Sequence, residues 1–181
     1  MLLKSLKDCQ LSIGSYPIFQ YDATGGGGKG LLHDTDKKNI QHIRFNKNEF
    51  SIPPLNWKTT KLLSLPIPPG INIKISLKKL EGKVNQETIE INLDLEARFI
   101  LTIFSIIKLP YLSVNTLLSN KKFKSTINRE NPQGRSKNKV VLTTLLGETI
   151  IPATGNVLLD SFLGLPNKAE ALLKCEIDFQ T

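Results

Sequence analysis

The fold is decided by INIKISLKKLEGKVNQETIEINLDLEA, the stretch that covers residues 71–97. Apolar residues occupy the odd positions 71–77 and 89–97 of this stretch, and polar residues alternate with them. This period of two is typical of half-buried β-strands, and residues 84–87 can supply a turn between them. The stretch therefore predicts an antiparallel hairpin, and the slip in the apolar phase near Lys78 and Lys79 indicates a β-bulge.

Directly after this hairpin the alternation ends, because residues 99–107 are apolar at nearly every position. A strand that is covered on both faces has this pattern, and so does a patch that contacts lipid or a protein partner. We expect burial on both faces. The most apolar stretch of the chain, residues 99–112, contains Lys108 and Pro110 and is shorter than the roughly 20 residues of a spanning helix, so we expect no transmembrane segment.

A second pair of β-rich stretches lies at residues 111–118 and 140–151. The connection between them contains Asn-Pro-Gln-Gly at residues 131–134, and this order of Pro and Gly favours a type I turn. We expect a long hairpin at about residues 112–150. Few helices are expected. Residues 166–174 begin with a Pro that is followed by good helix formers, and residues 157–162 can form one or two helical turns that end at Gly164. Residues 175–179 predict a last strand.

These patterns predict one domain over residues 1–181. Its fold class is mainly β, an antiparallel sandwich or partly open barrel with one short C-terminal helix. A chain of 181 residues, of which 40% are hydrophobic, is long enough to bury a core without disulfides or metals. Cys9 and Cys175 are the only cysteines and lie far apart in the sequence, so they indicate no disulfide framework or metal-ligand spacing.

Positive charge is concentrated in the predicted long hairpin. The formal net charge of +8 could also result from codon usage that favours Lys and Asn. Seven basic residues against one acidic residue lie within residues 119–140. We take them as the candidate site for anions or a membrane: Lys121, Lys122, Lys124, Arg129, Arg135, Lys137 and Lys139. They can rest on an anionic membrane surface, grip nucleic acid phosphates, or only keep a protruding hairpin in solution. Sparse Arg and the single aromatic Phe123 make nucleic acid the weaker of the two binding hypotheses.

Motifs for chemistry are few. The glycine-rich residues 22–30 resemble a phosphate-binding loop, but Lys29 precedes Gly30 where a P-loop requires Ser or Thr, so we expect a flexible or tight turn. His33, Asp36 and His42 are the only residues from which we could draw a mononuclear metal site, and polar loops often contain such groups without metal. We assign no catalytic residue, no metal site and no cofactor.

The start of the chain has no apolar run followed by a small-residue cleavage site, so we expect no secretory signal. Together with the absence of a disulfide framework, this predicts a soluble protein in the cytoplasm, or one that is peripheral to a membrane.

Three strings of the sequence carry a resemblance. They are IPPLNWKTTKLLSLPIPPG at residues 52–70, YDATGGGG at residues 21–28 and LEARF at residues 95–99. With them the chain loosely resembles an uncharacterised family of proteins from cyanobacteria and related plastids, and the likeness covers much of the chain. None of the strings is tied to a known activity, so the resemblance implies lineage and transfers no functional residue.

The sequence thus favours a non-enzymatic accessory or binding protein that acts at an anionic surface. This surface is either a membrane or a protein complex associated with a membrane. In a variant of this hypothesis, the protein also binds lipid in an apolar cavity. The alternatives are a nucleic-acid-binding protein that uses a basic β-ribbon, and an enzyme with an unrecognised polar site. In the enzyme alternative, a catalytic carboxylate pair could come from Glu90, Asp94 and Glu96, which share one predicted strand face. Pairing of these carboxylates with Lys74 and Lys78 is the simpler role.

Overall fold

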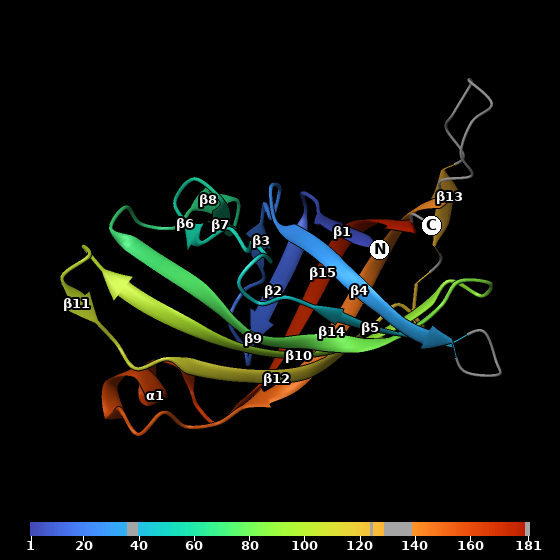
Figure 1. Cartoon of the computed structure of the whole chain (residues 1–181). Helices are drawn as coiled ribbons and strands as arrows, with labels where there is room; N and C mark the ends of the chain where they lie inside the picture. Colours follow the sequence, from blue (N-terminus) through green and yellow to red (C-terminus); the bar gives the residue numbers. More distant parts are fainter. Residues whose placement is uncertain (36–39, 124, 129–138, 180–181) are drawn as a thin grey trace.

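The computed structural model describes residues 1–35, 40–123, 125–128 and 139–179. Within these residues the chain forms fifteen strands and one short helix (Figure 1). In chain order they are β1 (Leu2–Ser5), β2 (Cys9–Ile13), β3 (Phe19–Tyr21), β4 (Gly27–Thr35), β5 (Ile40–Phe45), β6 (Leu55–Asn56), β7 (Thr60–Leu62), β8 (Leu65–Pro66), β9 (Ile71–Asn85), β10 (Glu90–Ile103), β11 (Ile107–Lys108), β12 (Leu112–Ser119), β13 (Thr126–Asn128), β14 (Lys139–Ile151), α1 (Val157–Leu163) and β15 (Asn167–Phe179).

All strands belong to one antiparallel sheet that closes in part into a ring. From β14 the pairing runs through β12, β10, β9, β5, β4 and β1 to β15, and β15 pairs with β14 again. A branch of short strands, β2, β3, β7 and β8, continues from β15. The prediction of a mainly β, antiparallel fold with one short helix is confirmed.

The decisive stretch forms the hairpin of β9 and β10, the two longest neighbouring strands. Glu96 lies opposite Lys79 and Ala97 lies opposite Leu77, which leaves Lys78 as the extra residue of a bulge. The apolar phase slip in the sequence therefore marks a real bulge. The bulge lets both halves of β9 direct their apolar side chains to the same interior.

The helix predicted at residues 166–174 is wrong, because these residues begin β15. Each residue of β15 has a partner on β14, and the other edge of β15 pairs first with β2 and then with β1. Hydrogen bonds on both edges outweigh the local helix propensity of Ala169, Ala171 and Leu172.

The short helix forms instead at α1, where the sequence predicts one or two helical turns that end at Gly164. Asn156 caps α1, since its side-chain oxygen accepts a hydrogen bond from the Leu159 N–H at 2.9 Å. Gly164 ends the helix in the left-handed conformation, which costs glycine little.

The expected burial of residues 99–107 on both faces is also wrong. β10 ends at Ile103, Phe104 and Ile106 lie in an exposed turn between β10 and β11, and Ile107, which begins β11, is also exposed. The other interpretation of the pattern, a surface patch, fits this turn.

A smaller buried cluster of Cys9, Tyr21, Ala23 and Leu55 packs against Ile73 and Phe99, and a larger core fills one half of the molecule. Its buried side chains come from the strands of the ring and include Leu3, Ile43, Val84, Ile91, Leu145 and Ile177. The termini and β13 lie toward this half, on the right in Figure 1, whereas β6, β7, β8, β11 and α1 lie at the opposite end. Within the described residues, the single helix is too short to cross a bilayer.

Candidate functional site

A cavity of about 420 Å³ lies in the half of the molecule that the core does not fill. Ile73, Phe99 and Val114 form one wall, from β9, β10 and β12, and Leu11 and Phe19 form another, from β2 and β3. This volume lies within the range of about 300–1,000 Å³ that is usual for pockets of small ligands. The cavity is therefore large enough for a ligand and not merely a packing defect.

Small residues on β14 and β15 create this space. Gly147, Ala169 and Ala171 line the cavity, whereas Leu145 and Ile177, further along the same two strands, are fully buried in the core. Because side chains at alternate positions share one face of a strand, the change from small to large residues divides the interior into an open half and a filled half.

The lining presents few polar groups to a ligand. The hydroxyl of Thr116 donates to the carbonyl oxygen of Glu148 at 3.0 Å, and the hydroxyl of Thr149 donates to that of Asn115 at 2.6 Å. Both donors are thus used across the β12–β14 ladder. An apolar group without charge suits the remaining surface, because a buried charge without a partner is costly.

The helix α1 covers one side of the cavity. Leu159 is buried and points to the lining, and Phe162 and Leu163 also contribute to it. The ring of Phe162 lies 5.6 Å from the ring of Tyr16 between their centroids, and the Tyr16 hydroxyl donates to the Phe162 carbonyl oxygen. These contacts fasten α1 to the turn between β2 and β3.

Exposed apolar side chains surround this end of the molecule, and we call them the apolar rim. They are Leu63 and Leu65 beside β8, Phe104 and Ile106 between β10 and β11, and Val157 and Leu158 on α1. Ile106 is 85% exposed and Leu158 is 81% exposed. In Figure 1 these three segments lie in the left half of the molecule, with β8 at the top, β11 at the far left and α1 at the bottom. The rim and the cavity thus share one end of the chain's fold.

The basic hairpin lies at the other end. β12 and β13 both pair with β14, and β13 stands at the upper right in Figure 1. Lys121 forms an ion pair with Glu90 at 3.0 Å, and Lys122 forms one with Glu148 at 2.6 Å. Lys139 begins β14. Lys124, Arg129, Arg135 and Lys137 lie outside the described residues, so the site proposed from them remains a prediction.

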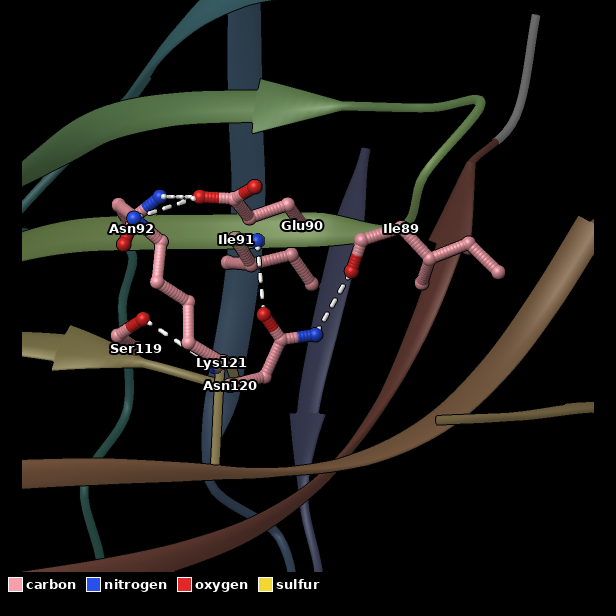
Figure 2. Close-up of polar contacts among 7 residues, drawn as sticks. All are labelled: Ile89, Glu90, Ile91, Asn92, Ser119, Asn120 and Lys121. Carbon is pink, nitrogen blue, oxygen red and sulfur yellow. Dashed lines mark hydrogen bonds and ion pairs between the residues drawn. The ribbon is translucent and has the colours of Figure 1, made fainter. Parts of the chain in front are cut away.

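A buried asparagine fixes the base of this hairpin (Figure 2). The side-chain oxygen of Asn120 accepts from the Ile91 N–H at 2.9 Å, and its amide donates to the Ile89 carbonyl oxygen at 2.7 Å. The same amide also donates to Ser125 Oγ at 3.1 Å. Asn120 therefore connects the start of the hairpin to the first residues of β10.

Glu90, one of the three carboxylates that share a face of β10, has structural partners. Lys121 and Asn92 donate hydrogen bonds to Glu90, and these bonds lower the pKa of its carboxyl. Across the β9–β10 ladder Glu96 lies opposite Lys79. The Lys79 ammonium, however, forms its ion pair with Glu81 of its own strand, at 2.9 Å. Among the described residues no ion pair joins Glu96 or Asp94 to Lys74 or Lys78, so the predicted cross-strand pairing with these two lysines is not found.

The two histidines do come together. His33 lies opposite His42 in the β4–β5 ladder, and both line a shallow polar depression. Asp36 lies outside the described residues. No group of three metal-ligating side chains occurs within the part of the chain that the structure describes.

The glycine-rich turn before β4 serves packing. Gly27 has a positive φ of 121°, and a β carbon there would lie 2.0 Å from the carbonyl oxygen of Leu3. The glycine thus permits β1 and β4 to approach closely. Of the predicted turn over residues 22–30, residues 24 and 25 do form a turn, whereas residues 27–30 belong to β4.

The sequence matches no protein-family model, and no curated protein or solved structure is significantly similar to it. The cavity residues therefore rest on geometry alone. Sequence reasoning missed them, because they come from strands far apart in the chain. The only local signal is the placement of Gly147, Ala169 and Ala171 within otherwise β-rich apolar stretches.

Proposed function

We propose that this protein is a non-enzymatic accessory protein that binds an apolar ligand, such as a lipid acyl chain or an isoprenoid, in its cavity. The observation that carries the proposal is the cavity of about 420 Å³ with its almost wholly apolar lining. A protein interior is normally filled to a high density, so an open apolar space of this size indicates a place for a guest molecule.

The chemistry of the lining defines the ligand class. Thr116 and Thr149, the hydroxyl groups of one wall, donate to backbone carbonyl oxygens, and Glu170 is exposed at the edge. A charged headgroup would lose its hydration inside such a space. The ligand is therefore an uncharged apolar molecule, or a lipid whose headgroup stays outside.

Two measurements on the whole chain test this function. The first is native mass spectrometry of the freshly purified protein, followed by organic extraction, which should reveal a copurifying apolar molecule. The second is titration with the neutral apolar fluorophore N-phenylnaphthylamine, whose emission should rise on saturable binding and fall again when a fatty alcohol displaces it.

The titration has a built-in comparison. Replacement of Ala171, whose side chain lines the cavity, by phenylalanine should abolish saturable binding. Replacement of Lys168 by phenylalanine puts the same ring on an exposed position of the same strand and should leave the affinity unchanged. Equal fluorophore binding by the wild type and by Ala171→Phe would reject the cavity as the ligand site.

The basic hairpin is a separate hypothesis. Binding of an anionic surface by Lys121, Lys122 and their neighbours stays a prediction, and the two described lysines already have acidic partners in Glu90 and Glu148. The cavity is the feature with the stronger structural support.

A further inference from the structure

We propose that the apolar rim docks this protein onto an anionic lipid bilayer, with the mouth of the cavity facing the membrane. The membrane-facing surface would thus be the end formed by β8, β11 and α1, opposite the basic hairpin (Figure 1). Docking itself stands on the rim and does not require an occupied cavity. Only the transfer of a ligand between bilayer and cavity rests on the proposed function.

The first support is the shape of the rim. Its side chains come from three separate segments, and each segment presents its apolar residues at the tip of a turn or on the outer face of a short helix. Leu63, Ile106 and Leu158 are 73%, 85% and 81% exposed. Side chains that protrude to this degree can each enter the boundary between headgroups and acyl chains.

The second support is charge. Residues 54–72, 99–112 and 151–168, which build this end, contain four lysines and one acidic residue, Asp160, and a second acidic residue, Glu170, is exposed at the edge of the cavity. The lysines are Lys58, Lys61, Lys108 and Lys168; all are exposed, and no ion pair joins any of them to a described residue. Lysines near the surface are attracted by anionic lipids.

Asp160, one of the two acidic residues at this end, has hydrogen-bond partners in its own loop. The Asp160 carboxylate accepts hydrogen bonds from the backbone N–H groups of Thr154 and Gly155, at 2.8 and 2.9 Å, and from the Thr154 hydroxyl at 2.6 Å. These bonds hold the carboxylate in the loop before α1, and its negative charge remains. Four lysines against Asp160 and Glu170 still leave a net positive charge. The net field at this end suits anionic headgroups.

Aromatic residues give a third support. Trp57, the only tryptophan, and Tyr111 are both exposed beside the rim segments. The Lys58 ammonium lies 5.4 Å from the Trp57 ring, and the Arg98 guanidinium lies 4.3 Å from the Tyr111 ring. Trp and Tyr side chains favour the headgroup region, where one part of the ring system is apolar and another is hydrated.

A bilayer also explains why the rim and the cavity share one end. An apolar ligand that entered from the opposite end would have to pass the filled core of Val84, Ile91 and Ile177. A mouth that opens onto acyl chains lets the ligand move without crossing water, which is unfavourable for an apolar molecule.

The experiment is cosedimentation of the whole chain with vesicles of phosphatidylcholine alone and of phosphatidylcholine mixed with phosphatidylglycerol. We expect binding to the mixed vesicles and weaker binding at high salt. Trp57 reports directly on the orientation: its emission should shift to the blue on binding and be quenched by lipids with brominated acyl chains.

Two sets of substitutions assign the surface. Leu65→Gln, Ile106→Gln and Leu158→Gln together remove one apolar side chain from each rim segment, and Lys61→Glu with Lys108→Glu reverses the nearby charge. Each set should weaken partitioning into the mixed vesicles by about tenfold or more. The control pair Lys121→Glu and Lys122→Glu, at the far end, should leave both partitioning and the Trp57 shift unchanged.

Three outcomes would overturn the inference. The first is loss of vesicle binding in the control pair but not in the rim variants, which would assign the membrane surface to the hairpin. The second is no vesicle binding by the wild type. The third is a dimer in sedimentation velocity that the rim glutamines dissociate, which would make the rim an interface between copies of the chain.

Failure of docking is distinguishable from failure of the proposed function. Ala171→Phe should lose N-phenylnaphthylamine but still bind vesicles, whereas the triple glutamine variant should keep the fluorophore in solution and lose the vesicles. Near-wild-type thermal unfolding of the rim variants is expected, because their substituted side chains are exposed.

Discussion

Gly147 lies directly opposite Ala171 in the ladder between β14 and β15, and both line the cavity. The open space thus depends on the small side chain of Ala171, whereas at Gly147 the side chains of Leu118 and Thr116 occupy the place of a β carbon, at 2.7 and 3.0 Å. Ala171→Phe should fill part of the cavity and change the free energy of unfolding by less than about 1.5 kcal/mol, because a cavity can accept added volume with little strain. Chemical denaturation of the variant and of the wild type measures this difference.

A phenylalanine substitution at a position in the packed core serves as the comparison. Cys175, four residues further along β15, is fully buried in the core. Cys175→Phe should therefore destabilise the fold by about 3 kcal/mol through overpacking. Equal destabilisation by the two phenylalanines would show that no usable space exists beside Ala171.

Asn120→Ala should destabilise the protein by about 3 kcal/mol. The substitution leaves the Ile91 N–H and the Ile89 carbonyl oxygen without their partner in a buried site, and each unsatisfied group costs about 1–3 kcal/mol. Denaturant unfolding measures the effect. The control Asn115→Ala removes an exposed side chain of β12 and should cost less than about 0.5 kcal/mol; similar costs for both would contradict the role of Asn120.

Gly27→Ala should be among the most harmful small substitutions, at about 3 kcal/mol or more. Its new β carbon would meet the Leu3 carbonyl oxygen at 2.0 Å, on a backbone with φ of 121°. Gly25→Ala tests strain without a clash, since Gly25 has a φ of 88° and open space around it, and about 1 kcal/mol is expected. Thermal unfolding measures the loss of stability in both variants. Equal losses would disprove the close approach of β1 and β4 at Gly27.

Alkaline pH should weaken the fold through Cys175. Burial raises the pKa of its thiol from 9.0 to about 12, so the folded state holds this proton more tightly than the unfolded state. The stabilisation is complete below pH 9 and is lost as the pH rises from about 9 to 12, with a slope of about 1.4 kcal/mol for each pH unit.

Cys175→Ala isolates this effect. The variant should start from a lower stability at pH 7, because a buried sulfur is lost, but its stability should fall less steeply between pH 9 and 12. Part of the slope should remain, since burial also raises the pKa of Tyr21. Urea titrations at several pH values measure the slopes, and identical slopes in both proteins would contradict the assignment.

Local patterns in the sequence predict several elements correctly. The alternation over residues 71–97 predicts the β9–β10 hairpin and its bulge at Lys78, and the turns before Gly164 predict α1. These features depend on residues that are neighbours in the chain, so the pattern of apolar side chains and a glycine that accepts a left-handed conformation are sufficient to specify them.

Contacts between distant segments decide the rest. Residues 167–174 have the composition of a helix and become a strand because β14 pairs with one of their edges and β2 pairs with residues 169–172 on the other. The turn around Phe104 and Ile106 is as apolar as a core strand, yet no described segment covers it. A sequence shows which side chains avoid water, but only the packed chain determines which of them find partners, and the cavity and the apolar rim are what that packing leaves open.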